Sequence, residues 1–159
     1  MAAPASVTHS VSFALLSPRD SRTEFSFWCL WSAPLLVTSD VRGLFGHRKE
    51  ILTNAEVIAV NQDALATAGD RISFNNDTGA QVWYKPLANG DIAVLLFNSH
   101  NTHTIDVSCS WQQFGFVSAA AVRNMWQRKD LGPMSAGISS KLAPHDVMFL
   151  RVTPVTPSC

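Results

Sequence analysis

The pattern of apolar and polar positions changes near residue 70. Before this point the apolar residues form helix-length stretches and one continuous run, whereas after it they form short alternating runs. Clustering at a period of 3.6 residues is typical of helices, and alternation is typical of half-buried strands. The sequence TNAEVIAVNQD, residues 53–63, lies at the join. The pattern therefore predicts a mixed first part and an all-β second part.

The first part predicts a helix followed by a buried strand. Residues 21–32 are apolar over much of the helix circumference, with Thr23 as N-cap, so we expect this helix to be covered on more than one side. Pro34 ends it. The continuous apolar run in residues 34–40 fits a strand buried on both faces, as in parallel sheets.

Two further helical segments follow. Residues 48–52 predict a helical turn, and residues 53–63 a short helix capped by Asn54. Glu56 suits the positive end of its dipole. Helix, strand and helix make up a slice of an α/β fold, because one strand cannot form a parallel sheet alone.

The second part predicts an antiparallel sandwich. Short alternating runs separated by turn signals are typical of this architecture. The predicted strands are residues 71–74, 81–85, 92–97, 102–110, 117–126, 137–142 and 147–152. Residues 127–136 are polar and contain Gly and Pro, so we expect them to be a connection.

The amino-acid composition narrows the range of possible partners and cofactors. The 159 residues are 47% hydrophobic and 15% charged, which indicates a globular chain. Twelve basic and twelve acidic residues cancel, and no long basic run exists, which argues against nucleic acid or a membrane as partner. Cys29, Cys109 and Cys159 fit neither a disulfide framework nor a zinc pattern. The sequence contains no glycine-rich phosphate loop and no zinc pattern, so we expect neither a cofactor nor a metal. The N-terminal residues show no evident signal peptide.

Two single residues are candidates for function. Asp40 follows the predicted strand, where active sites of α/β barrels lie, although an ion pair with Arg42 is the structural alternative. Asn76 begins the triplet Asn-Asp-Thr, which accepts a glycan in a secreted protein.

Aromatic and histidine residues allow structural as well as functional interpretations. Four aromatic residues could stack on a sugar or fill the core. His100 and His103 could bind a metal, but no acidic partner is fixed beside them. His145 and Asp146 are typical of a turn. The aromatic set is Trp83, Tyr84, Trp111 and Trp126.

Four segments together resemble a known family. They read FSFWCLWSAPLLVTSDVR, EILTNAEVIAVNQDALATAGDRI, VWYKPLANGDIAVLLFN and APHDVMFLRVTP. Over residues 22–154 the chain is similar to the C-terminal part of α-galactosidases (melibiases) of glycoside hydrolase family 27, of the plant and algal type. The resemblance implies a fold class: an α/β remnant, the last helix–strand–helix of a TIM barrel, followed by an all-β antiparallel Greek-key sandwich.

The resemblance also implies domain boundaries. Residues 1–20 would be an unstructured or non-family leader, and residues 21–66 the C-terminal piece of a (β/α)8 barrel, with its last strand at residues 35–39. Residues 70–154 would be the sandwich and residues 155–159 a tail. The chain then corresponds to a truncated product or to part of a longer protein. The family usually has Gly where Ala66 stands, so we expect a looser linker here.

The implied chemistry is hydrolysis of terminal α-D-galactosyl residues with retention. Two aspartates about 5–5.5 Å apart perform such a reaction. In the family they lie on the fourth and sixth barrel strands, before everything matched here, so no catalytic residue is assigned and we expect this chain alone to be inactive. The substrate would be a galactoside, and the family is usually secreted, vacuolar or lysosomal.

Two other interpretations stay open. The sandwich could be a non-enzymatic module that binds a carbohydrate or a partner. The chain could also be an inert remnant, in which four apolar residues lose their cover: Trp28, Trp31, Leu35 and Leu36. The sequence leaves open the oligomeric state and the choice between α-galactosidase and α-N-acetylgalactosaminidase.

Overall fold

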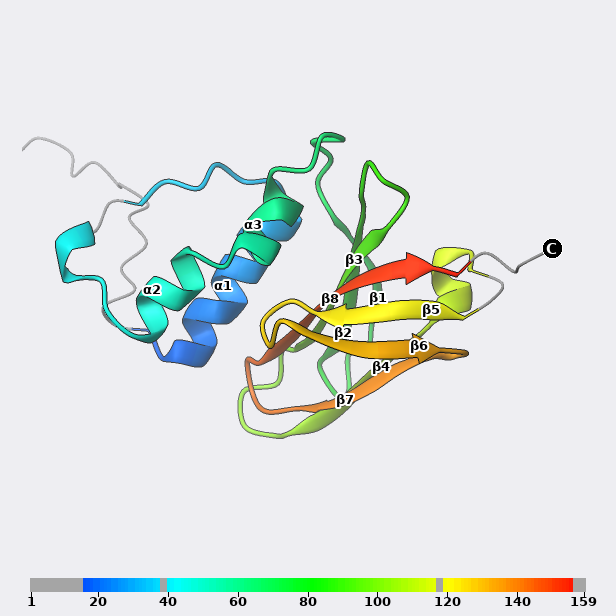
Figure 1. The fold of residues 1–159 in the computed structure, drawn as a ribbon. Coiled ribbons are helices and arrows are strands. Elements are labelled where there is room, and N and C mark those ends of the chain that lie inside the picture. The colour runs from blue at the N-terminus through cyan, green and yellow to red at the C-terminus, as the bar shows by residue number, and fades with distance from the viewer. Residues whose placement is uncertain (1–15, 38–39, 117–118, 156–159) are drawn as a thin grey trace, which may run out of the picture.

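The chain folds into three layers (Figure 1). A computed structural model describes residues 16–37, 40–116 and 119–155. A group of helices covers one face of a six-stranded antiparallel sheet, and a two-stranded sheet covers the other face. The helical part and the antiparallel sheets confirm the predicted fold class.

The first helix, α1 (Pro18–Leu30), starts earlier than the sequence pattern indicates. Proline suits the first helical position, and the Ser17 side chain accepts a hydrogen bond from the backbone N–H of Asp20. The prediction of Thr23 as N-cap is therefore wrong. Thr23 lies inside α1, and its hydroxyl donates to the backbone carbonyl of His145 at 2.6 Å.

The two later helices are confirmed. They are α2 (His47–Leu52) and α3 (Ala55–Asn61), and a short 3-10 helix, η1 (Val41–Gly43), precedes them. The Asn54 side chain caps α3 by accepting from the backbone N–H groups of Glu56 and Val57, at 3.0 and 3.3 Å. Its amide also donates to the carbonyl of Met125, so this cap ties α3 to the sandwich.

The predicted strand after Pro34 is not formed. Residues 33–37 have no helix or strand assignment, and residues 38–39 lie outside the described residues. A parallel strand needs neighbouring strands to pair its backbone groups, and the described chain supplies none on this side. Leu36 and Val37 are exposed instead of buried on both faces.

Seven predicted strands are present, and one was missed. The large sheet has the order β1-β2-β3-β8-β5-β6, and β4 pairs with β7. The missed strand is β6 (Lys129–Met134), which lies at the edge of the large sheet, where Gly132 and Pro133 are tolerated. The others are β1 (Asp70–Phe74), β2 (Ala80–Pro86), β3 (Ile92–Asn98), β4 (Ile105–Ser110), β5 (Ala120–Asn124), β7 (Gly137–Leu142) and β8 (Val147–Pro154).

The central strand β3 contributes to two cores. Ala93 and Leu95 belong to the cluster formed with the helices, whereas Val94 and Leu96 belong to the cluster between the two sheets. Because neighbouring side chains of a strand point to opposite faces, β3 is buried along nearly its whole length. The helices are therefore part of the hydrophobic core of this chain.

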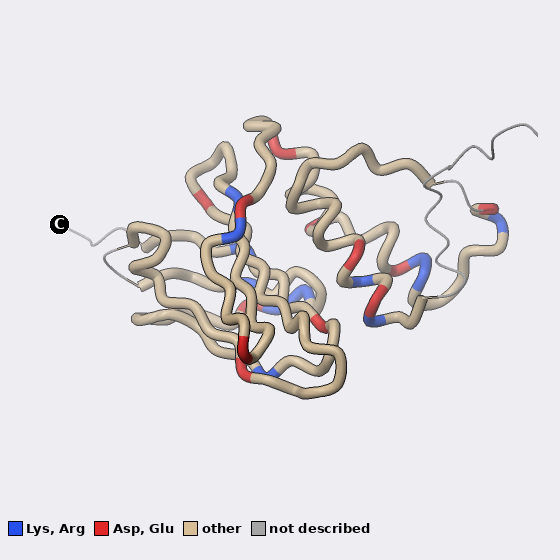
Figure 2. The backbone as a smooth tube through the Cα atoms, turned by 180° about the vertical axis from the view of Figure 1, so that it is seen from behind, with Lys and Arg blue, Asp and Glu red and all other residues tan. Residues whose placement is uncertain are grey.

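Charged groups reinforce the junction between the helices and the sandwich. Glu56 of α3 accepts two hydrogen bonds from the guanidinium of Arg123 in β5, both 2.7 Å long. Arg22 of α1 pairs with Asp146 at 2.8 Å. Figure 2 shows acidic and basic positions interspersed along the chain, without a long stretch of one sign. Among the described residues, no helix is long and apolar enough to cross a membrane.

Candidate functional site

Asp40 is held by its own neighbour. Its carboxylate accepts from the backbone N–H, the Nε and the Nη2 of Arg42, at 3.0, 2.9 and 3.0 Å. These bonds to Arg42 lower the pKa of the Asp40 carboxyl. Asp40 is exposed and caps η1. The structure therefore contains the Asp40–Arg42 ion pair that was the structural alternative to a role in function. A role of Asp40 in substrate binding stays a prediction.

Other carboxylates of the helical part have separate structural partners. Glu56 is bound to Arg123, and Asp63 accepts from the backbone N–H groups of Leu65 and Ala88. Retaining glycosidases need two carboxyl groups facing one sugar from about 5–5.5 Å apart. Glu56 and Asp63 are thus both held by partners within the fold.

The four candidate aromatic residues do not form one platform. Trp111 is only 1% exposed, and its indole N–H donates to the carbonyl of Met134, so it belongs to the core between the sheets. Tyr84 packs on Phe114 in that same core. Trp83 packs edge-on against Phe27 and Trp31 at the helical side. Only Trp126 borders a cavity described below.

The two histidines lie against each other in the loop after β3. The His103 Nδ1 and the His100 Nε2 are 3.2 Å apart, and the His100 Nδ1 accepts backbone N–H groups from Thr102 and His103. These hydrogen bonds give the two histidines a structural role in holding the loop. Within the described residues, no group of three or more His, Cys, Asp or Glu side chains could hold a metal ion.

The two described cysteines are buried thiols, not a disulfide. Burial raises the pKa of Cys29 to about 12 and that of Cys109 to about 11. Neither group is a thiolate at neutral pH, which is the reactive form. Cys29 packs as a small apolar side chain in the core formed with the helices, and Cys159 lies outside the described residues.

Asn76 lies in the turn between β1 and β2. It is exposed, and the neighbouring Asn75 holds the turn by accepting from the backbone N–H groups of Asp77 and Thr78. The position leaves room for a glycan, and glycosylation of Asn76 stays a prediction.

An apolar surface lies on the helical part, around η1. Leu36 is 71% exposed and Phe45 is 75% exposed, and Val37 and Val41 are also exposed. Val37, Val41 and Phe45 line one common hollow, and Leu36 precedes Val37 in the chain. Trp31 is also exposed, whereas Trp28 and Leu35 are partly buried against the core. Of the four residues expected to lose their cover, two therefore do so. We call Leu36, Val37, Val41 and Phe45 the apolar face.

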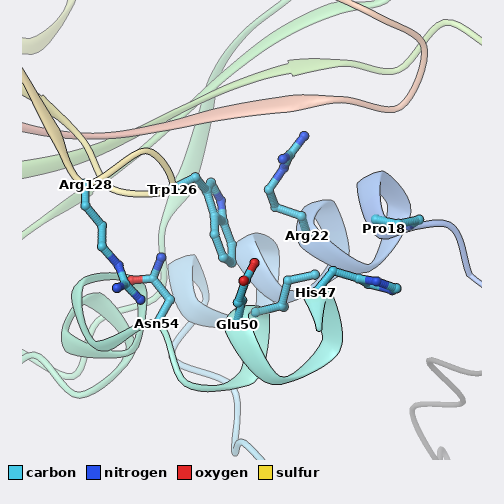
Figure 3. A pocket seen from close by; sticks show the side chains of 8 residues that line it. Pro18, Arg22, His47, Glu50, Asn54, Trp126 and Arg128 are labelled. Atoms are coloured by element: carbon cyan, nitrogen blue, oxygen red, sulfur yellow. The ribbon is translucent and has the colours of Figure 1, made fainter. Parts of the chain in front are cut away.

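A second feature is a cavity of about 350 Å³ where α1, α2 and the β5–β6 turn meet. Figure 3 shows its lining, with the Trp126 indole between Asn54 and Glu50, and Arg128 beside Asn54. The sequence did not predict this site, because its residues come from three separate segments without a shared spacing.

Family comparisons divide the chain as the fold does. Residues 77–152 match the family described as the alpha galactosidase C-terminal beta sandwich domain. Residues 10–63 match the family described as alpha galactosidase A. The first match covers most of the sandwich, and the second covers the helices.

Similar proteins and structures agree with this division. An α-galactosidase of Oryza sativa is 37% identical over 87% of this chain, which corresponds to 33% of the relative. The crystal structure of α-galactosidase I from Mortierella vinacea matches with a TM-score of 0.82 and 26% identity, over 92% of this chain and 38% of that one. A family 27 β-L-arabinopyranosidase from Geobacillus stearothermophilus shares the fold, with a TM-score of 0.82 and 23% identity over 91% of this chain and 32% of that one.

These matches relate the chain to the C-terminal part of family 27 glycoside hydrolases. Within that class the chain is homologous to the C-terminal part of α-galactosidases. It spans about a third of the length of the curated relatives it matches.

Proposed function

We propose that this chain forms the C-terminal part of a retaining α-galactosidase that acts on terminal α-linked galactose. In this proposal, residues 21–66 complete a (β/α)8 barrel and residues 70–154 form the sandwich behind it. The homology to α-galactosidases supports the reaction. A β-L-arabinopyranosidase shares the fold, so the proposal of galactose rests on the homology and not on the fold.

The apolar face is the observation that carries this proposal. Leu36 and Val37 belong to the segment that resembles the last strand of the barrel, and both are exposed here. Burying an exposed Leu, Val or Phe side chain contributes roughly 1.5–3 kcal/mol. The remaining strands and helices of a barrel are the cover that such residues have in the family.

The chemistry in this proposal comes from carboxylates outside the chain. Asp40, Glu56 and Asp63 are bound to Arg42, Arg123 and backbone N–H groups. We therefore expect residues 1–159 to hydrolyse no α-galactoside by themselves. A chromogenic α-galactoside tests this directly, with a full-length family member as positive control, and turnover above background by the purified chain would contradict it.

Complementation tests the structural half of the proposal. The corresponding C-terminal part of the Oryza sativa relative is removed, and its remaining barrel is co-expressed with residues 1–159. We expect this chain to restore part of the activity, because the apolar face would be covered again. Leu36→Asp should prevent restoration, and Phe74→Asp, which changes an exposed apolar residue of β1, should not. Equal activity with and without the chain would overturn the proposal.

A further inference from the structure

The cavity beside Trp126 has the size of a small-molecule site. Its volume of about 350 Å³ is at the lower end of the roughly 300–1,000 Å³ typical of ligand pockets. The walls come from α1, α2 and the turn that joins β5 to β6 (Figure 3). Two hydrogen bonds, from Asn54 to the carbonyl of Met125 and from Trp126 to Ser26 of α1, fix the parts around the cavity relative to each other.

Trp126 provides a fixed apolar wall. Its indole N–H donates to the hydroxyl of Ser26 at 2.9 Å, and that hydroxyl donates to the carbonyl of Arg22 at 2.7 Å. The Phe25 ring supports it, with ring centroids 6.4 Å apart. A half-buried ring held in this way offers apolar area without a cost in side-chain ordering when a ligand packs on it.

Polar groups border the same space. In Figure 3 the Glu50 carboxylate reaches from α2 toward the indole, and the Arg128 side chain descends from the β5–β6 turn beside Asn54. The carboxylate accepts hydrogen bonds, and the guanidinium donates them. A sugar hydroxyl does both. The Asn54 side chain is already used as a helix cap and as a donor to Met125, so Glu50 and Arg128 are the residues available to recognise a ligand.

The charges of the wall favour a neutral ligand. The Arg22 guanidinium is compensated by Asp146 at 2.8 Å, and the lining also contains one acidic residue, Glu50, and one further arginine, Arg128. An anion would meet the Glu50 carboxylate, and a cation would meet Arg128. An apolar ring next to one acceptor and one donor suits a pyranose, which has an apolar C–H face and a rim of hydroxyl groups.

We propose that this cavity binds a neutral pyranose, with the sugar ring on Trp126 and its hydroxyl groups bonded to Glu50 and Arg128. This binding is separate from hydrolysis, since it uses no carboxylate of a retaining pair. It gives the chain a carbohydrate contact whether or not the proposed barrel assembly is correct.

The test observes the indole N–H signals of the whole chain by NMR. Residues 1–159 are labelled with ¹⁵N and titrated with D-galactose, D-glucose, raffinose and, separately, sodium sulfate. The Trp126 signal is assigned from its loss in Trp126→Phe. We expect the Trp126 signal to move and saturate with a Kd on the order of 1 mM for at least one sugar. Tighter binding of raffinose than of the monosaccharides would identify an oligosaccharide as the ligand, and equal binding would identify a single pyranose.

Matched variants test whether Glu50 and Arg128 bind the sugar. Glu50→Gln and Arg128→Met are both at exposed positions, and each should weaken binding about tenfold or more, while the other indole signals stay in place and report an intact fold. Arg71→Met is the control, because Arg71 packs on the ring of Trp83 away from the cavity, and it should bind sugar like the unchanged chain. The proposal is overturned by no saturable shift up to roughly 50 mM sugar, by equal loss in the control, or by a Trp126 shift with sulfate alone.

Discussion

The ammonium group of Lys85 donates a hydrogen bond to the hydroxyl of Ser32, with 2.6 Å between Nζ and Oγ. The same ammonium donates to the backbone carbonyl of Val60. Lys85 belongs to β2, Ser32 follows α1, and Val60 lies in the last turn of α3, so one fully buried cation joins the sandwich to two helices. The carbonyl groups at a helix C-terminus have partial negative charge, which favours a cation there.

Lys85→Met should destabilise the chain by leaving the carbonyl of Val60 without its charged donor. A buried polar group that loses its partner costs about 1–3 kcal/mol, and we expect the free energy of unfolding to fall by about this amount. Urea denaturation followed by circular dichroism measures it. Lys129→Met, at an exposed position of β6, is the control and should change stability by less than about 0.5 kcal/mol. Equal stability of the two variants would show that the buried hydrogen bonds contribute nothing net.

The stability contribution of Lys85 should also depend on pH. Burial lowers the pKa of Lys85 below its ordinary value, while the negative charge of Asp63 opposes this effect. The unfolded chain therefore keeps the lysine proton at pH values where the folded chain loses it, and stability rises with pH where the unfolded state binds more protons. The cost of burying the charge is present below the folded pKa and is relieved as pH rises toward the unfolded pKa.

The comparison of two chains isolates this effect. Unfolding free energies of the unchanged chain and of Lys85→Met are measured at pH 7 and at about pH 10, near the ordinary lysine pKa. We expect their difference to move in favour of the unchanged chain at the higher pH. The Cys29 thiol, with a pKa of about 12, stays protonated in both chains. A difference independent of pH would show that the pKa of Lys85 is the same folded and unfolded.

Arg123 links α3 to β5 through Glu56 and makes a second ion pair with the more exposed Asp130. Bidentate pairs are stronger than single contacts, but pairs this accessible are worth at most about 1 kcal/mol. We expect Glu56→Gln to lower the unfolding free energy by up to about that amount and Asp130→Asn by less. A double-mutant cycle with Arg123→Met measures the Glu56–Arg123 coupling, which high salt should reduce. If Glu56→Gln and Asp130→Asn lowered the unfolding free energy equally, the expectation that the Glu56 pair is the stronger one would be wrong.

The sequence pattern predicts the sandwich well because alternation reports a local property. A strand with one buried face shows this alternation, and β3, which is buried on both faces, shows a continuous apolar run instead. Short apolar runs between turn signals predicted seven of the eight strands. The edge strand β6 was missed because Gly132 and Pro133 interrupt the pattern. An edge strand has one unpaired side, so a missing N–H at Pro133 costs little there.

Features that depend on distant partners were not predictable from local pattern. The apolar run after Pro34 predicts a buried strand, but strand formation requires neighbours that the described chain does not provide at this point. The cavity beside Trp126 combines Arg22, Glu50 and Arg128, which lie on three elements. The burial of Lys85, at the end of the predicted strand 81–85, has no local signal either, because it arises only when the segments of Ser32 and Val60 lie over β2.

Gly137 should be intolerant of any side chain. It pairs with Ser110 between β7 and β4, and a Cβ atom added there would lie 2.1 Å from the carbonyl oxygen of Cys109. Backbone atoms cannot yield as a flexible side chain can, so we expect Gly137→Ala to lower the unfolding free energy by about 1–3 kcal/mol or more. Gly43→Ala is the control, because a Cβ at Gly43 meets no atom within 4 Å. Thermal and urea unfolding of both variants measure the difference, and similar stability of the two would mean that β4 and β7 separate at little cost.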